Sequence, residues 1–289
     1  MDQEILRKKL DESGYVYDET LLTVLTVALA LGRPLLIEGA AGVGKTEIAK
    51  VMAAALDRDL VRLQCYEGLD ESKALYEWNY QKQLLAIQIG MGKETGNMTR
   101  ELFSEEYLLE RPLLKSIRSE KEVVLLIDEI DKADEEFEAF LLELLSEMQV
   151  TVPELGTVKA KTVPFVVLTS NRARPLSEAL RRRCAYLYIP YPDMEKELAI
   201  LRAKLPHVDD KLCAQVALAV QRLRSNEAIL KKPSIAETLD WASALDALGI
   251  RELTPDALRN TAGFLLKSSE DMEEMAKMKL SDCGGNCHG

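Results

Sequence analysis

Eight consecutive residues, Gly39–Thr46, read GAAGVGKT and match the phosphate-binding pattern G-x-x-x-x-G-K-[ST]. In this pattern the glycines let successive backbone N–H groups point at phosphate oxygens, the lysine reaches the β and γ phosphates, and the following hydroxyl ligates Mg²⁺. The spacing therefore predicts a site for a nucleoside triphosphate and Mg²⁺. The predicted phosphate-binding residues are Gly39, Ala40, Ala41, Gly42, Val43, Gly44, Lys45 and Thr46, and Thr46 is also a predicted metal ligand.

The residues on either side of this loop predict the strand and the helix that the pattern requires. Pro34–Ile37 is an apolar run typical of a buried strand, and Gly44–Ala55 is rich in helix-forming residues. Such a helix would direct its first N–H groups and the positive end of its dipole toward the phosphates. An ordinary glycine turn is the alternative interpretation.

Two carboxylates follow a second apolar run. Val123–Ile127 is typical of a strand buried on both faces of a parallel sheet, and it is followed by Asp128 and Glu129. Because the carboxyl ends of such strands face the ligand crevice, we expect Asp128 to help hold Mg²⁺ and Glu129 to polarise the water that attacks the γ phosphate. An acid-rich helix start is the alternative, since Asp131 and Asp134 come next.

Asn171 is the third candidate catalytic residue. A further apolar run, Phe165–Thr169, would deliver Ser170 and Asn171 to the same sheet edge as Asp128. An amide at this edge can hydrogen-bond both the attacking water and the γ phosphate. Asparagine is also common in turns for conformational reasons alone, which is the alternative.

The remaining pattern predicts an α/β domain followed by helices. An apolar stripe predicts a helix over 133–148, and a short hairpin is expected to pair 150–152 with 158–161 through a turn at 153–156. Four amphipathic helices are predicted after Pro192, over 195–205, 209–224, 234–248 and 255–266. They would suffice for a small lid over the nucleotide, or for a plain helical bundle.

Composition and charge narrow the functional classes. The chain has 289 residues and a formal net charge of -11, so its mean field disfavours nonspecific binding to nucleic acid or anionic membranes. Its first residues lack a signal-peptide pattern, and the most apolar stretch, Leu21–Leu31, is too short to span a bilayer. We expect a cytoplasmic protein without a membrane span.

The cysteines are five in number and scattered, which argues against a disulfide framework. With only two histidines, the chain lacks the ligands for a catalytic metal site built from several histidines. Cys283, Cys287 and His288 could bind a soft metal, but a frayed terminus is the simpler interpretation of this glycine-rich end.

The motifs together resemble the AAA+ ATPases of the MoxR type. The resemblance rests on the loop, the Val123–Glu129 strand, Thr169–Asn171 and the Arg181–Arg183 run, and it covers nearly the whole chain. The resemblance is closest to the branch linked to carbon monoxide dehydrogenase maturation (CoxD-like), judging by the residues at 76–80, 110–114 and 179–184.

This resemblance implies ATP as the nucleotide and a ring, usually of six subunits, with ATP bound between neighbours. Arg183, or alternatively Arg182, would reach the γ phosphate of the next subunit, although a solvated basic cluster is the simpler interpretation. Many relatives place an arginine early in the third lid helix, where this chain has Lys232; lysine offers a point charge in place of a fork.

The resemblance also implies a fold, a domain division and partners. We expect a doubly wound parallel α/β domain (1–192), a helical lid domain (193–280) and a flexible tail (281–289). The segment 68–120, with a polar loop at 92–96, would carry an insertion on the ring surface, in which Trp78 and Tyr80 are expected in the core. A chaperone that matures a metalloenzyme together with a von Willebrand factor A-type partner is the implied function.

Two other functions remain open. A small-molecule phosphotransferase would share the phosphate loop and the sheet, but not the Asn171, arginine and lid features. A nucleic-acid motor or clamp loader is disfavoured by the acidic balance and by the lack of an appended DNA-binding motif.

Overall fold

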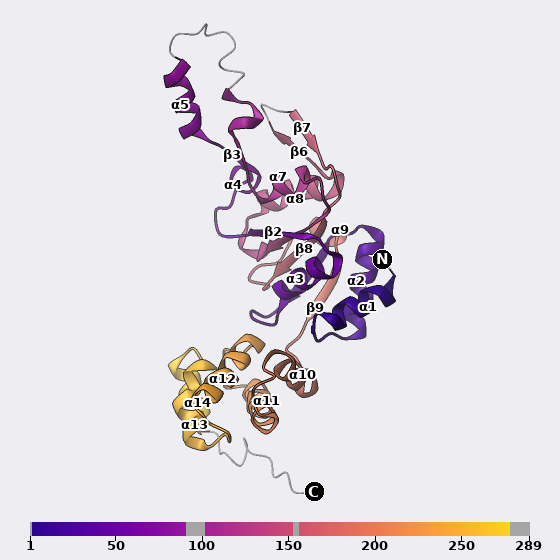
Figure 1. Ribbon diagram of the computed structural model, residues 1–289. Coiled ribbons are helices and arrows are strands. Elements are labelled where there is room, and N and C mark those ends of the chain that lie inside the picture. The colour runs from indigo at the N-terminus through magenta and orange to yellow at the C-terminus, as the bar shows by residue number, and fades with distance from the viewer. Residues whose placement is uncertain (1, 91–101, 153–155, 278–289) are drawn as a thin grey trace. The chain divides into compact units, whose positions relative to one another are not determined.

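The computed structural model describes residues 2–90, 102–152 and 156–277, which fall into two compact units (Figure 1). The first unit comprises Met1–Leu6, Glu19–Glu38 and Thr46–Tyr188, and the second comprises Arg7–Asp18, Gly39–Lys45 and Ile189–Gly289. Helix α1 (Gln3–Glu12) contributes residues to both units.

A five-stranded sheet in the order β2-β5-β8-β1-β9 forms the centre of the α/β fold. Its strands are β1 (Leu35–Gly39), β2 (Asp59–Gln64), β5 (Val123–Asp128), β8 (Phe165–Ser170) and β9 (Ala185–Ile189). The pairs β2–β5, β5–β8 and β1–β8 are parallel. Every residue of β1, β5 and β8 is buried, which explains their continuous apolar sequences. The predicted fold class is confirmed.

Helices accompany these strands along the chain. They are α2 (Glu19–Leu31), α3 (Lys45–Leu56), α7 (Pro112–Arg118), η2 (Ile130–Lys132), α8 (Glu135–Glu147) and α9 (Glu178–Arg183). Asp134 caps α8 by accepting a hydrogen bond from the Phe137 backbone N–H at 2.8 Å, and the helix ends where Met148 turns to a positive φ. The apolar side of α8 then packs into the core beneath the sheet, as the stripe predicted.

In the sequence, several smaller elements separate β2 from β5. They are α4 (Glu71–Leu75), β3 (Tyr76–Trp78), α5 (Tyr80–Gly90), η1 (Glu105–Tyr107) and β4 (Leu108–Glu110), with β3 and β4 antiparallel. Trp78 is buried, as predicted, and meets Tyr76 and Phe103 edge to face. The prediction for Tyr80 is wrong, because this residue opens α5 and is 62% exposed. The polar loop at 92–96 lies outside the described residues.

The predicted hairpin is present as β6 (Gln149–Val152) and β7 (Gly156–Lys159), which pair antiparallel. Residues 153–155 of its expected turn lie outside the described part of the chain.

The second unit is mainly helical. Its helices are α10 (Met194–Lys204), α11 (Asp210–Ser225), α12 (Ile235–Ala247), α13 (Pro255–Thr261), η3 (Ala262–Phe264) and α14 (Ser269–Lys277). Trp241 is fully buried at its core, and its indole N–H donates to Thr261 Oγ1 at 2.7 Å. All four predicted helices are therefore present, and the fourth is split into α13 and η3. Helix α14 was not predicted.

The described residues were also searched for membrane-spanning helices and for clusters of metal ligands. Within 2–90, 102–152 and 156–277, no helix is long and apolar enough to cross a membrane. No cluster of potential metal ligands of the His, Cys, Asp or Glu type occurs in the same part of the chain. The candidate tail ligands Cys283, Cys287 and His288 lie outside it.

Candidate functional site

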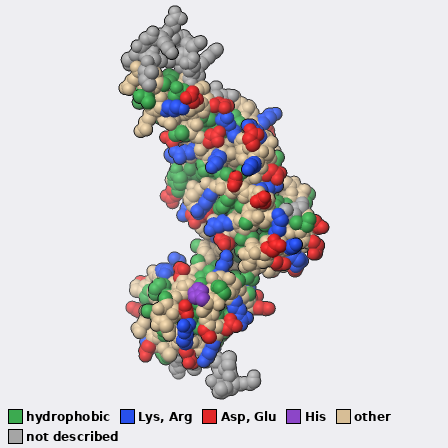
Figure 2. Space-filling view, viewed as in Figure 1, with side chains coloured by type: hydrophobic (Ala, Val, Ile, Leu, Met, Phe, Trp, Pro, Cys, Tyr) green, Lys and Arg blue, Asp and Glu red, His purple; other side chains and the backbone are tan. Residues whose placement is uncertain are grey.

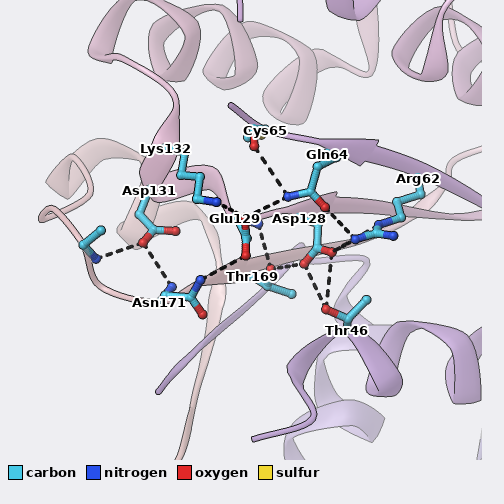
Figure 3. A network of polar contacts seen from close by, with 11 residues as sticks. Thr46, Arg62, Gln64, Cys65, Asp128, Glu129, Asp131, Lys132, Thr169 and Asn171 are labelled. Atoms are coloured by element: carbon cyan, nitrogen blue, oxygen red, sulfur yellow. Dashed lines mark hydrogen bonds and ion pairs between the residues drawn. The ribbon is translucent and has the colours of Figure 1, made fainter. Parts of the chain in front are cut away.

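The centre of the site is the Asp128 carboxylate at the end of β5 (Figure 3). Thr46, in the first turn of α3, donates its hydroxyl to Asp128 Oδ1 at 3.0 Å, and Thr169 of β8 donates to the same oxygen. The Asp128 side chain is only 4% exposed. The structure thus brings together the two residues proposed as metal ligands, and a hydroxyl beside a carboxylate is a donor set that suits Mg²⁺.

Arg62 contacts Asp128 from the neighbouring strand β2. Its Nε and Nη2 atoms donate to Asp128 Oδ2 at 3.1 and 2.6 Å. The Arg62 side chain is 51% exposed, in contrast to the buried carboxylate. Nη2 also donates to Gln64 Oε1, so the guanidinium joins two residues of β2 to the acidic centre. Arg62 and Gln64 were not predicted as site residues. The one signal for them in the sequence was the alternation of polar residues with the apolar Val61 and Leu63, which are buried.

Glu129 adopts a left-handed backbone conformation, with φ at 57°. This conformation is uncommon for a residue with a side chain, and the Glu129 N–H is held by Thr169 Oγ1 at 2.9 Å. The Glu129 carboxylate accepts hydrogen bonds from Gln64 Nε2 at 2.9 Å and Asn171 Nδ2 at 3.2 Å, and it forms an ion pair with Lys132 at 2.6 Å. Hydrogen bonding and charge from Glu129 raise the pKa of Lys132.

Asp131 fixes the loop that carries Asn171. One of its oxygens accepts the backbone N–H groups of Asn171 at 3.1 Å and Ala173 at 2.9 Å. Its other oxygen is buried without a hydrogen-bond partner. Of the acids in this segment, only Asp134 acts as the helix cap that the alternative interpretation required, whereas Asp131 has a positioning role.

The pKa of Cys65 reflects the negative charge of the carboxylates around it. Burial, and then the charges of Asp128, Asp131 and Glu129, raise the pKa of the Cys65 thiol to about 12. A strongly acidic environment beside a phosphate loop requires cations before it can accept a polyanion.

The phosphate loop runs from the end of β1 to the start of α3. The Lys45 side chain is buried, and its Nζ donates to the carbonyl oxygens of Gly39 at 2.9 Å and Ala40 at 2.7 Å. The ammonium group is therefore held by backbone carbonyl oxygens of the loop itself. Thr46 follows Lys45 directly, so the peptide bond between them links the loop to the Asp128 cluster.

Two glycines of the loop cannot carry side chains. A Cβ atom on Gly39 would lie 2.4 Å from the Ile189 carbonyl oxygen. Gly42 has a φ of +74°, and a Cβ atom there would lie 2.4 Å from Ser234 Oγ, at the N-cap of α12. The Ala236 N–H also donates to the Gly42 carbonyl at 3.3 Å. The loop therefore rests closely against the start of α12.

The candidate arginines lie elsewhere. Arg183 ends α9 and donates from Nε to Ser146 Oγ of α8 at 2.8 Å, whereas Arg182 pairs with Glu178 one turn earlier. Both arginine side chains are exposed. Lys232 donates to the Asn226 carbonyl within the helical unit. The contacts described for Arg182 and Arg183 do not reach the Asp128 cluster.

A comparison with protein families decides the identity of the α/β region. The sequence profile of the AAA domain (dynein-related subfamily) matches residues 34–184, just over half of the chain. The chain belongs to this AAA domain family. The AAA+ part of the resemblance is thereby confirmed, while the MoxR and CoxD-like branch remains a prediction.

Two curated proteins are similar in sequence to this AAA protein over most of its length. Uncharacterized protein YehL of Escherichia coli (strain K12) is 25% identical over 289 residues, covering 88% of this chain and 74% of its own. Uncharacterized protein YojN of Bacillus subtilis (strain 168) is 28% identical over 279 residues, covering 93% of this chain and 84% of its own.

Solved structures of RuvB from Thermotoga maritima resemble this AAA protein in fold. One variant superposes with a TM-score of 0.51 at 19% identity, covering 92% of this chain and 75% of that one. The RuvB Holliday junction branch migration motor gives a TM-score of 0.47 at 19% identity, covering 94% and 72%. At this identity the first likeness shows a shared fold.

Proposed function

We propose that this AAA protein hydrolyses ATP with Mg²⁺. The observation that carries the proposal is the convergence of Thr46, Asp128 and Glu129 at the carboxyl edge of the sheet, directly after the phosphate loop. Mg²⁺, when bound, would neutralise charge on the β and γ phosphate oxygens. Thr46 and Asp128 would hold it, because they supply adjacent oxygen ligands, one half-buried and one buried.

The loop residues Gly39–Thr46 would hold the triphosphate. Their backbone N–H groups would bind phosphate oxygens, and Lys45 would exchange the carbonyls of Gly39 and Ala40 for the β and γ phosphates. The carbonyl contacts keep the buried ammonium satisfied until a nucleotide arrives. The N-terminus of α3 favours the same anion through its dipole and the direction of its first N–H groups.

Glu129 would orient and polarise the attacking water. The Glu129 side chain is 29% exposed, so water can reach it, and Lys132 keeps a positive charge beside it. Asn171 contacts Glu129 and lies on a loop fixed by Asp131, which suits an amide that bonds both the water and the γ phosphate. We propose Glu129 and Asn171 as catalytic residues on this basis.

We further propose a MoxR-type remodelling role, closest to the CoxD-like branch. The protein would form a ring, usually of six subunits, in which Arg183 from one subunit reaches the nucleotide of the next. The exposure of Arg183 at the end of α9 supports this role. The client would be a metalloenzyme and the partner a von Willebrand factor A-domain protein. The domain division at residue 192 and a cytoplasmic location belong to the same proposal.

The two alternatives have weaker support. A phosphotransferase would need an acceptor in place of the water beside Glu129. A nucleic-acid motor would fit the RuvB-like fold, but the chain has a net charge of -11. On the face shown in Figure 2, the Lys and Arg side chains are interspersed with Asp and Glu.

Phosphate release from ATP, measured with water as the only acceptor, tests the proposal. Wild-type protein should hydrolyse ATP, and Glu129→Gln should lower the rate by about 100-fold or more while nucleotide binding persists. The matched control is Glu136→Gln, which removes the same charge from an exposed residue in the first turn of α8 and should leave the rate unchanged.

Light scattering with ATP and Mg²⁺ on the Glu129→Gln protein tests the ring. Arg183 would be supported as the residue acting on the neighbour by two results: the nucleotide-dependent assembly persists when Arg183→Ala is added to Glu129→Gln, and Arg183→Ala alone abolishes ATP hydrolysis. ADP formation that appears only when a small-molecule acceptor is added, with the phosphate transferred to that acceptor, would overturn the ATPase proposal in favour of the phosphotransferase.

A further inference from the structure

Arg62 lies on the exposed face of the edge strand β2, yet its side chain ends on a buried carboxylate. In β2, Val61 and Leu63 are buried, whereas Arg62 and Gln64 point out of the core. The register pairs Gln64 with Asp128 across the β2–β5 ladder, so Arg62 begins two residues short of the sheet edge. Its long side chain covers that distance and ends on Asp128 Oδ2.

The guanidinium supplies the positive charge that Asp128 needs. The carboxylate is almost fully buried, and its other donors, Thr46 and Thr169, are neutral hydroxyls. A buried carboxylate without a countercharge is costly, and a bidentate arginine contact offsets much of that cost. In the described part of the chain, Arg62 is the cation that forms an ion pair with Asp128.

A divalent metal held by Thr46 and Asp128 would need the same electron pairs. Both Arg62 donors lie on Oδ2, and Thr46 reaches both oxygens, at 3.0 and 3.3 Å. Two cations on one carboxylate repel each other, so binding of either one weakens binding of the other. The Arg62 side chain is half exposed, so it can turn into solvent if it gives up its contacts to Asp128 Oδ2 and Gln64 Oε1.

We propose that Arg62 is a positioning residue that stands in for the metal on Asp128 in the nucleotide-free protein and releases the carboxylate when the metal–nucleotide complex binds. This inference rests on the proposed ATPase function. It makes Mg²⁺ binding a competition, so that the apparent affinity for the metal is weaker than Asp128 and Thr46 alone would give.

Binding of a fluorescent ADP analogue over a series of Mg²⁺ concentrations tests the inference without requiring hydrolysis. For Arg62→Gln, the Mg²⁺ concentration that gives half of the full effect should fall by about tenfold, the order expected for a charge-assisted contact that is half exposed. Affinity for the analogue in EDTA should stay within about twofold of wild type. Arg62→Lys keeps the charge but loses the fork, so its midpoint should fall by only about threefold.

Arg58→Gln is the matched control. Arg58 directly precedes β2, at its other end, and pairs with the exposed Glu122, so its loss changes the net charge equally but should leave the Mg²⁺ midpoint unchanged. Should Arg62→Gln fail to fold, the Arg62→Lys shift alone decides the matter.

The outcomes separate the two proposals. An unchanged or raised Mg²⁺ midpoint in the Arg62 variants, with normal nucleotide binding by wild type, overturns the inference alone. Weaker binding of the analogue in EDTA would also overturn it, because Arg62 would then be a phosphate ligand. A wild-type protein that binds no nucleotide overturns the proposed function and this inference with it.

Discussion

Replacing Arg224 by methionine should lower the free energy of unfolding of the C-terminal helical unit more than a substitution on its surface does. Glu197 is fully buried and accepts hydrogen bonds from Arg224 at 2.7 and 2.8 Å, from Gln221 at 2.7 Å and from Thr238 at 2.9 Å. Arg224 also donates to the Pro233 carbonyl at 2.8 Å, just before α12. Removing one partner of such a pair leaves an uncompensated buried charge, which costs about 3–5 kcal/mol.

The loss should depend on pH in a definite direction. Burial raises the pKa of Glu197, and the Arg224 charge opposes that rise. Without Arg224 the pKa of Glu197 in the folded protein rises further above its unfolded value. The folded protein then binds the proton more tightly than the unfolded chain, so stability is lost as pH rises through the folded pKa and regained as pH falls. The Arg224→Met defect should be smaller at pH 5 than at pH 8.

Urea unfolding followed by the fluorescence of Trp241 measures the effect. A Trp78→Phe background leaves Trp241, at the core of the helical unit, as the only tryptophan. Because the chain has two compact units, the transition reported by Trp241 is assigned to the helical one. Adding Glu197→Gln to Arg224→Met should recover most of the lost stability, because the buried charge is then gone.

Arg202→Met provides the control, since it breaks an ion pair with Asp210 whose side chains are 53% and 72% exposed, and it should cost less than about 1 kcal/mol. The reasoning is refuted if Arg224→Met costs no more than this control, or if its cost is the same at both pH values.

Three further outcomes follow from the site. Thr169→Val removes the acceptor of the Glu129 N–H and a donor to Asp128, so it should cost about 1–3 kcal/mol in urea unfolding and slow ATP hydrolysis; an unchanged midpoint would contradict this. Asp131→Ala leaves two backbone N–H groups of the loop after β8 without an acceptor, and hydrolysis should fall more than nucleotide binding does. With its pKa raised to about 12, the Cys65 thiol should resist iodoacetamide at pH 8 until the protein unfolds, as peptide mapping would show; rapid labelling of native protein would argue against this environment.

Strands buried on both faces were predictable from sequence. The runs that became β1, β5 and β8 are continuously apolar, because neighbouring elements cover both of their faces. The residues just after them, or at their ends, therefore mark the sheet edge where Asp128, Glu129 and Asn171 lie. Their roles remain predictions, but their proximity followed from the strand ends alone.

Features that depend on contacts distant in sequence were not predictable. β2 is an edge strand with an exposed face, so its short alternation of polar and apolar residues gave little signal. The partners of Arg62 and Gln64 lie about 65 residues away along the chain, and nothing local to β2 indicates them. Tyr80 was misjudged because aromatic character favours burial only where a neighbouring element covers the side chain, and α5 leaves it exposed.

The close approach of Gly42 to Ser234 should couple the evolution of two positions that are distant in the sequence. A side chain at position 42 would collide with Ser234, and making room by a change to glycine at 234 would remove the hydroxyl that caps α12 together with Glu237. Neither change is neutral alone, so related chains should keep both residues or replace both, along with the cap. Covariation between positions 42 and 234 would thus be a mark, readable from sequences alone, of chains in which the phosphate loop and α12 meet in this way.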